Sequence, residues 1–279
     1  MAYKTILTVL TDSRELPQLD AAADLATRED GHLEVLCLGI NPAEAGYFFP
    51  GGAPYAFQET IAQAIEDAEV LEKAARARLA TRTDLRWSVD SAAAQTGGLA
   101  SLVGMRARFS DLTVLSRPYG PEAGAAAEAV TEAALFEGGC PVMILADAGL
   151  PANPPRRVLV AWNQSLEALA AVRRALPLLK AAESVEITVI DPRRAGAERS
   201  DPGGALAQML IRHGVKAEIA VLARTAPTIS DELNRRATEI GADLIVMGAY
   251  GHSRFREAIL GGATRNMLEK AKVPVLMAR

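Results

Sequence analysis

Hydrophobic and polar positions follow two patterns that alternate along the chain. Short runs of nearly continuous apolar residues, such as "RRVLVAW" (156–162) and "DLIVMGA" (243–249), have the length and composition of buried strands. Between them lie longer segments in which apolar residues recur every three or four positions, as on one face of a helix. Strands that alternate with helices and are apolar throughout predict a parallel sheet that helices cover on both faces.

The second half of the chain carries this pattern most clearly. A helix is predicted over 165–181, where Pro177 is expected to cause a kink or an early end. Another is predicted over 228–240, with Gly241 as its C-terminal cap. The remaining predicted elements are strands and a last helix: "VEITVID" (185–191), "KAEIAVLA" (216–223), "GATRNMLEKA" (262–271) and "VPVLMA" (273–278).

The first half follows the same plan with a longer helix. The apolar residues of this helix are spaced to form one buried face over five turns: Ile61, Ile65, Ala68, Leu71, Ala75 and Leu79. A second helix is predicted to point four apolar residues inward: Leu99, Leu102, Val103 and Phe109.

The two halves resemble each other segment by segment. "KTILTVLTDS" (4–13) matches "RRVLVAWNQS" (156–165), and "DLTVLSRP" (111–118) matches "DLIVMGAY" (243–250). "CPVMILAD" (140–147) matches "VPVLMAR" (273–279) in the same order. A repeat of this length indicates duplicated domains. We therefore predict an α/β protein of two tandem doubly wound domains, each with a five-stranded parallel sheet, over 1–146 and 157–279. A proline-rich linker over 147–156 is predicted to join them.

Composition narrows the class of protein without naming a function. The chain is 49% hydrophobic and 23% charged, with a net charge of −4, which is an ordinary globular balance. We therefore expect neither nucleic-acid nor membrane binding. Cys37 and Cys140 lie in apolar surroundings and are expected to be buried thiols in a soluble cytoplasmic protein.

A glycine-rich loop between the last predicted pair of strand and helix is the main candidate site. Gly248 ends the strand, Gly251 follows two residues later, and Gly261 and Gly262 open the helix. Bare backbone at both ends of a loop suits close approach of a ligand, and the first N–H groups of a helix attract anions. The alternative is a plain tight turn.

Basic residues in the same loop are consistent with an anion such as phosphate. His252 and Arg254 follow Gly251, and Arg256 and Arg265 come after them. Arg254 and Arg256 fit solvated surface charges equally well.

The last 38 residues, "ADLIVMGAYGHSRFREAILGGATRNMLEKAKVPVLMAR" (242–279), resemble the universal stress protein family. That family's signature is a glycine, two residues, a glycine, nine residues, a glycine and then Ser or Thr. Gly248, Gly251 and Gly261 fall at this spacing, and the doubled chain looks like a tandem member. The resemblance implies a five-stranded parallel α/β fold, dimerisation of two tandem chains through the last strand, and binding of ATP or AMP. Mg²⁺ is expected only as the ion that accompanies ATP.

The same resemblance assigns roles to residues of this chain. Val189 would contact adenine through its backbone, and Asn163 falls where the family has an aspartate. His252, Arg254 and Thr264 lie in or beside the phosphate loop. Six residues would line the ribose and phosphates: Met247, Gly248, Gly251, Gly261, Gly262 and Ala263.

Two positions depart from the family pattern. Gly262 stands in place of the Ser or Thr, so that a hydroxyl contact is lost, and Thr264 is a candidate to replace it. Asn163 removes a charged acceptor for the adenine amino group, although an amide oxygen can still accept a hydrogen bond.

The first half does not keep the glycine loop. Ser116 and Tyr119 stand where the second half has Gly248 and Gly251, and Glu122 and Glu128 would repel a phosphate. Asp12 lies near the corresponding place after the first strand, which is weak evidence by itself. We therefore expect no nucleotide in the first half and regard it as a pseudo-dimer partner of the second or as a separate ligand site.

A further segment, "NPAEAGYFFPGGAPYAFQ" (41–58), concentrates aromatic residues among prolines and glycines. It fits a loop packed on an apolar surface, and it fits a lid over an apolar small-molecule pocket.

Three classes of function remain open at this point. The leading one is a stress-response regulator that binds ATP or AMP. The second is a slow ATP-hydrolysing enzyme that uses the same site, although no general base stands out. The third is a scaffold whose site is vestigial. His32, His213 and His252 are scattered, so no metal site is predicted.

Overall fold

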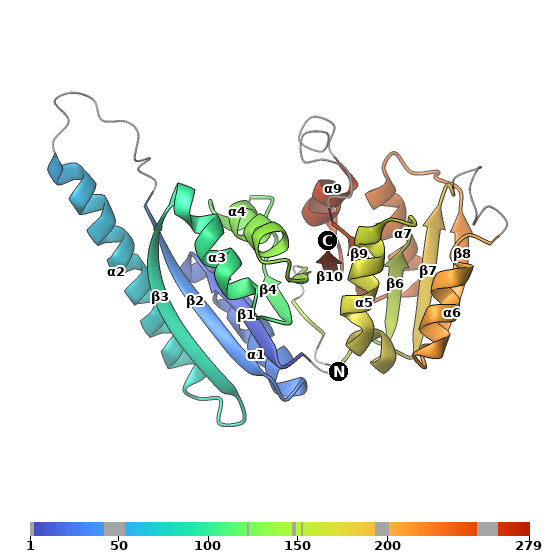
Figure 1. The fold of residues 1–279 in the computed structure, drawn as a ribbon, viewed down its shortest axis with the longest axis horizontal. Coiled ribbons are helices and arrows are strands. Elements are labelled where there is room, and N and C mark those ends of the chain that lie inside the picture. Colours follow the sequence, from blue (N-terminus) through green and yellow to red (C-terminus); the bar gives the residue numbers. More distant parts are fainter. Residues whose placement is uncertain are drawn as a thin grey trace. The chain divides into compact units, whose positions relative to one another are not determined.

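The computed structural model describes residues 3–41, 54–121, 123–146, 149–151, 153–192, 201–249 and 262–279, without the side chains of 54–58. It divides into two compact units, one that ends at Val142 and one that begins at Met143. Each unit is described by itself below (Figure 1).

The first unit is a parallel sheet with helices between its strands. Its hydrogen-bonded strands follow the order β3-β2-β1-β4, and β5 begins where the unit ends. Helices α1 and α2 pack together, as do α3 and α4, so that two helical layers result. Its elements are β1 (Thr5–Leu10), α1 (Leu16–Arg28), β2 (His32–Asn41), α2 (Pro54–Leu79), β3 (Arg86–Gln95), α3 (Leu99–Ala107), β4 (Leu112–Leu115), α4 (Ala127–Glu132) and β5 (Val142–Ile144).

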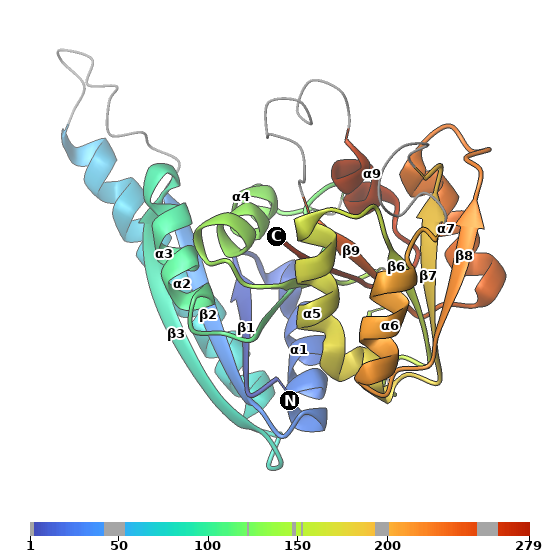
Figure 2. The same ribbon diagram turned by 45° about the vertical axis from the view of Figure 1, so that its right-hand side comes forward.

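The second unit repeats this arrangement. Its strand order is β10-β9-β6-β7-β8, in which β9, β6, β7 and β8 correspond to β4, β1, β2 and β3. Figures 1 and 2 show α5 and α6 on one face of its sheet. Helices α7 and α9 pack against each other. Its elements are β6 (Arg157–Ala161), α5 (Leu166–Ala181), β7 (Ser184–Ile190), α6 (Gly204–Arg212), β8 (Ala217–Leu222), α7 (Ile229–Ile240), β9 (Leu244–Gly248), α9 (Ala263–Lys270) and β10 (Val275–Ala278).

Paired strands within each unit run parallel, which confirms the predicted α/β fold class. In the second unit Ala161 of β6 is in register with Met247 of β9 and with Thr188 of β7. The carboxyl ends of these three strands therefore meet at one edge of the sheet. In parallel α/β sheets this edge is the place where ligands bind.

Local sequence signals explain where the helices of the second unit begin and end. The Ser165 hydroxyl accepts a hydrogen bond from the Ala168 N–H at 3.1 Å and caps α5, and Thr228 caps α7 in the same way. Gly241 ends α7 with a φ of 60°, which confirms it as the C-terminal cap. The expected early end at Pro177 is wrong, because α5 continues to Ala181.

Two predicted core residues of the first unit are exposed instead. Ile65 is 45% exposed and Phe109 is 76% exposed. The buried side of α2 passes through Ala64, Ala68 and Leu71, so the helix is rotated slightly from the predicted face. Phe109 follows α3 after the helix has ended, so helical spacing no longer determines where its side chain points.

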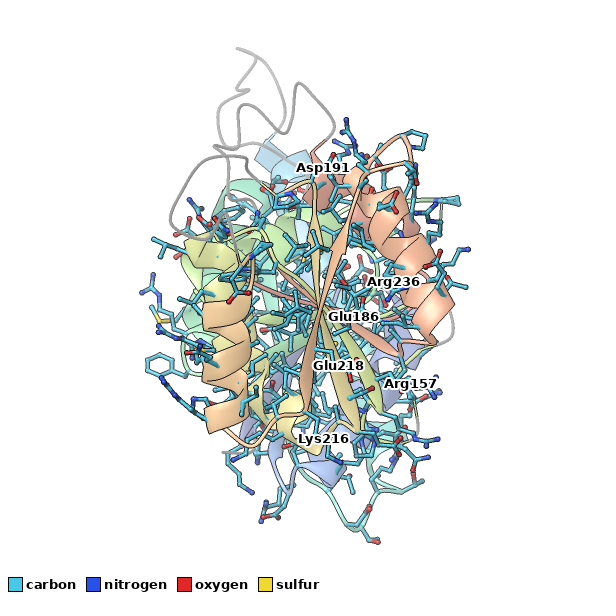
Figure 3. The ribbon with its side chains drawn as sticks, turned by 90° about the vertical axis from the view of Figure 1, so that its right-hand side faces the viewer. Arg157, Glu186, Asp191, Lys216, Glu218 and Arg236 are labelled. Carbon is cyan, nitrogen blue, oxygen red and sulfur yellow. The ribbon has the colours of Figure 1, made fainter. Side chains whose placement is uncertain are left out.

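Charged residues within the second unit are paired across the sheet and α7. Figure 3 views this unit from the side of β8 and labels Glu186 and Arg236 between the sheet and the helix. The guanidinium of Arg236 donates to both carboxylate oxygens of Glu186, at 2.9 and 2.6 Å. This bidentate pair attaches α7 to β7 and accounts for a carboxylate inside an otherwise apolar layer.

Two further sequence expectations can be compared with the described residues. Cys37 and Cys140 are both buried, as predicted, and burial raises the pKa of Cys37 to about 12. In the part of the chain that the structure describes, no helix is long and apolar enough to cross a membrane.

Candidate functional site

The carboxyl edge of the second unit brings several of the predicted site residues together. Met247 and Gly248 end β9, beside the end of β6, and Asn163 follows β6 by two residues. Val189 lies in β7 one residue before its end. Gly262, Ala263 and Thr264 form the start of α9.

The rest of the predicted loop lies outside the described residues. This applies to Gly251, His252, Arg254 and Gly261. It applies also to most of the aromatic segment 41–58, of which the structure describes Asn41 and the backbone of 54–58. Their assigned roles stay predictions.

Gly248 is a glycine for a reason that the sequence does not show. A Cβ atom on this residue would lie 2.5 Å from the backbone nitrogen of Ala168 and 2.7 Å from the carbonyl carbon of Glu167. The first turn of α5 therefore packs directly on the end of β9. Helix packing alone requires glycine at this position, independently of any ligand.

The start of α9 has the properties of an anion site. Gly262 is its N-cap, with φ −57° and ψ 157°, and a glycine has no side chain with which to cap the helix. The first N–H groups of a helix have no partner within the helix and carry the positive end of its dipole. The Thr264 hydroxyl belongs to a residue that is only 3% exposed, so it is a poor replacement for the missing hydroxyl at 262.

The side chain of Asn163 forms a tight turn with the backbone of the residues that follow it. Its Oδ1 accepts a hydrogen bond from the Ser165 N–H at 3.1 Å, while the residue remains exposed. Gln164, between them, has a φ of 64°, a conformation that residues other than glycine adopt rarely. The amide oxygen that was expected to accept a bond from adenine therefore accepts one bond within the chain and keeps a second lone pair.

The backbone of Val189 faces β8. The N–H groups of Val185 and Asp191 donate to the carbonyls of Lys216 and Leu222, so alternate residues of β7 turn their backbone groups to that strand. Val189 shares this parity and is in register with Val221. Contact between adenine and the Val189 backbone would require this ladder to open.

The corresponding place in the first unit contains a carboxylate of the chain itself. Glu15 Oε2 accepts hydrogen bonds from the Thr11 N–H at 2.5 Å and the Asp12 N–H at 3.3 Å. A Cβ on Gly124, in the loop before α4, would lie 3.2 Å from Glu15 Oε1. Burial raises the pKa of Glu15 above its ordinary value. A carboxyl group of the chain therefore lies at the place that corresponds to the start of α9 in the second unit.

Gln18 closes the same edge of the first unit. Its amide nitrogen donates to the Thr8 hydroxyl and the Val9 carbonyl, both at 2.8 Å, and its Oε1 accepts from the Ser116 N–H at 2.5 Å. The cavity beside Glu15 and Gln18 measures about 10 Å³, room for about one water molecule. It cannot hold a nucleotide.

Sequence reasoning missed Glu15, although a signal for it was present. Asp12 and Glu15 are three residues apart and form a capping box, in which each side chain bonds the backbone of the other. The three-residue spacing of Asp12 and Glu15 is visible in the sequence. The burial of Glu15 against the loop before α4 is not, because it depends on the fold.

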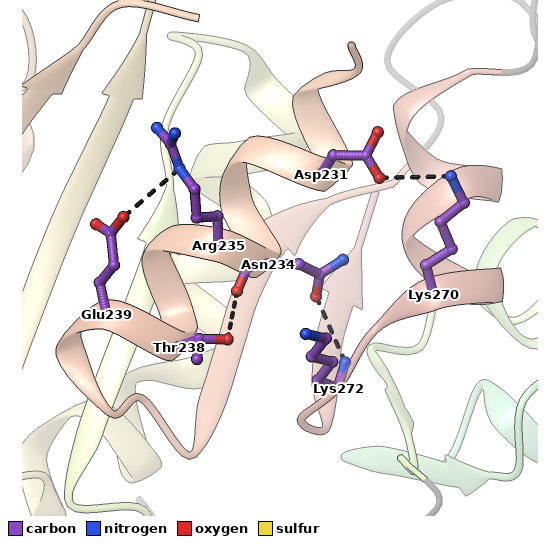
Figure 4. A pocket seen from close by; sticks show the side chains of 7 residues that line it. All are labelled: Asp231, Asn234, Arg235, Thr238, Glu239, Lys270 and Lys272. Atoms are coloured by element: carbon purple, nitrogen blue, oxygen red, sulfur yellow. Dashed lines mark hydrogen bonds and ion pairs between the residues drawn. The ribbon is translucent and has the colours of Figure 1, made fainter. Parts of the chain in front are cut away.

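A larger cavity lies elsewhere in the second unit. It measures about 430 Å³ and lies between α7 and α9 (Figure 4). Lys270 faces Asp231 at 3.4 Å, and Arg235 faces Glu239 at 3.5 Å. These two ion pairs offset four of the five charged groups on its walls, and Lys272 adds one further positive charge.

Two of the three histidines, His32 and His213, lie among the described residues. His32 Nε2 lies 3.0 Å from the Ser88 hydroxyl, and His213 ends α6. Among the described residues, no three His, Cys, Asp or Glu side chains are grouped so that they could hold a metal ion.

Comparison with known proteins identifies the second unit. Residues 155–279 match the model of the universal stress protein family. The universal stress protein Slr1230 of Synechocystis is 34% identical over 76 residues, which are 27% of this chain and 25% of that protein. The universal stress protein MJ0577 of Methanocaldococcus jannaschii is 35% identical over 49 residues, 18% of this chain and 30% of that protein. The chain thus matches less than a third of the length of either relative.

A solved structure extends the likeness in fold to the whole chain. A universal stress protein from Archaeoglobus fulgidus superposes with a TM-score of 0.70, covering 99% of this chain and 96% of its own. The identity is 16%, so this comparison concerns the fold alone. The fold, the glycine signature and the match over 155–279 agree: the second unit of this chain is similar to the universal stress protein family.

Proposed function

We propose that this chain is a stress-response regulatory protein that binds one nucleotide in its second unit. ATP and AMP are the ligands that the family resemblance implies, and Mg²⁺ would accompany ATP. The first unit would bind no nucleotide. Two chains would pair through their last strands, which a solution mass of about twice 29.5 kDa would support.

One observation supports this division of roles best. The helix after β9 begins at Gly262 without a side-chain cap, whereas the helix after β4 begins beside the carboxylate of Glu15. The two sheets share their strand order, so these positions are equivalent. An anion is attracted to the first and repelled from the second.

A pair of substitutions at Gly262 tests the proposal. Gly262→Asp places a carboxylate at the N-cap of α9, where it accepts hydrogen bonds from the same N–H groups that a phosphate would use. We expect this variant to lose nucleotide binding in calorimetry while its melting temperature stays the same or rises.

Gly262→Ser is the matched control, because it caps the same helix without a charge. We expect it to bind nucleotide at least as tightly as the wild type. If Gly262→Asp binds ATP and AMP as well as Gly262→Ser does, the proposed site is wrong.

A further inference from the structure

The cavity between α7 and α9 is lined by a buried amide with a free donor. Asn234 of α7 is 7% exposed and belongs to the cavity wall. Its Oδ1 accepts a hydrogen bond from the Lys272 N–H at 3.4 Å, and because an N–H group can only donate, this bond sets the orientation of the amide. The Nδ2 group is the other terminal atom, and no described residue accepts a hydrogen bond from it.

The Nδ2 group of Asn234 is placed to bind a ligand. Figure 4 shows Oδ1 turned to Lys272 and Nδ2 turned to the side of Lys270. Buried polar groups are nearly always paired in folded proteins. An amide donor that the described chain leaves unpaired, on the wall of a cavity of about 430 Å³, is therefore available to an acceptor that enters the cavity.

Lys272 supplies a positive charge on the same wall. Each of the other four charged wall residues lies within 4 Å of a group of opposite charge: Asp231, Arg235, Glu239 and Lys270. For the ammonium group of Lys272, the described residues provide neither a hydrogen bond nor an ion pair. One donor group and one unpaired positive charge thus lie on one wall.

The equivalent helices of the first unit, α3 and α4, are packed more closely at this place. A Cβ on Gly138, just after the helical segment that continues α4, would lie 2.5 Å from the Cβ of Ala107 in α3. Pro141 and Pro274 hold the same place in the two sheets, because their carbonyls accept from β4 and β9 respectively. Counting back from these prolines, Lys272 stands where the first unit has a glycine. The cavity is therefore a feature of the second unit and not of the fold that both units share.

We propose that this cavity binds a small organic acid, whose carboxylate accepts hydrogen bonds from Asn234 Nδ2 and is balanced by the charge of Lys272. A carboxylate accepts hydrogen bonds without donating any, and it carries one negative charge, which matches this wall. A volume of about 430 Å³ is typical of small-molecule sites. The cavity lies at the end of α9, whereas the proposed nucleotide site lies at its start, so this inference goes beyond the proposed function.

Benzoate and benzamide are the matched probes, because they have nearly the same size and differ in charge. Titrations followed by NMR, on the Asn234 side-chain signal and the backbone signals of α7, give both dissociation constants. We expect benzoate to bind about tenfold more tightly than benzamide, which is about 1.4 kcal/mol. We expect Asn234→Asp to lose benzoate binding, because its second oxygen would repel the carboxylate.

A pair of lysine variants keeps the test independent of folding. Lys272→Gln changes an exposed residue, and we expect it to weaken benzoate binding about threefold. Lys216→Gln is the matched control, because it removes the same charge from an exposed residue beside β8, outside the cavity wall (Figure 3).

Three results would overturn the inference and leave the proposed nucleotide site untouched. The first is that benzamide binds as tightly as benzoate. The second is that both lysine variants change the dissociation constant of benzoate equally. The third is that benzoate moves no signal of the cavity wall.

Discussion

Substituting Gly248 by alanine tests whether this glycine serves the fold or only a ligand. The new Cβ would lie 2.5 Å from the Ala168 nitrogen, about 0.9 Å closer than an ordinary van der Waals contact of 3.4 Å. The opposing atoms belong to the backbone of α5 and cannot rotate away. Overpacking of this kind costs about 2 kcal/mol, which lowers the melting temperature by about 4–8 °C in a protein of this size.

The assay is thermal unfolding of the ligand-free protein, with Gly98→Ala as control. A Cβ on Gly98 would meet no atom within 4 Å, and the residue has a right-handed backbone conformation, so its substitution is expected to change stability by less than about 0.5 kcal/mol. If Gly248→Ala melts within about 1 °C of the wild type without ligand, the packing argument is refuted. The glycine would then serve the ligand alone.

Three further predictions concern groups on either side of the site. Glu15→Gln is expected to become more stable relative to the wild type as pH rises above 4.5. The carboxyl of Glu15 then ionises through its raised pKa, so that only the wild type buries a charge. The measurement is urea unfolding between about pH 4 and pH 8, and a constant difference in the free energy of unfolding would contradict the prediction. Ser165→Ala removes the cap of α5 and is expected to cost about 1 kcal/mol in the same assay, and an unchanged unfolding midpoint would show that the cap is unimportant. Cys37 and Cys140 are expected to react with a thiol reagent only after unfolding, and fast labelling of the native protein would contradict their burial.

The sequence predicts the elements of the fold well because their signals are local. The cap residues Ser165, Thr228 and Gly241 act on the turn in which they stand, and near-continuous apolar runs identify the strands of each sheet. Ile65 is harder to predict, because helical spacing fixes a face only to within part of a turn and the neighbouring strands decide its rotation.

The site is predicted less completely, because its chemistry depends on contacts between distant segments. The spacing of glycines locates the loop, but the clash between a residue-248 side chain and α5 involves residues about 80 positions apart. The Asn163 substitution is visible in the sequence. The structure adds that its amide oxygen accepts a hydrogen bond from the Ser165 N–H, a contact that depends on the turn after β6.

The central claim is that the two units have divided their roles, so that one of them binds a nucleotide. The most direct measurement is the number of nucleotide molecules bound per chain at saturation, by equilibrium dialysis with ATP and with AMP. The account predicts one for the nucleotide that binds, and none for the Gly262→Asp variant. Two molecules per chain, or none with either nucleotide, would contradict it.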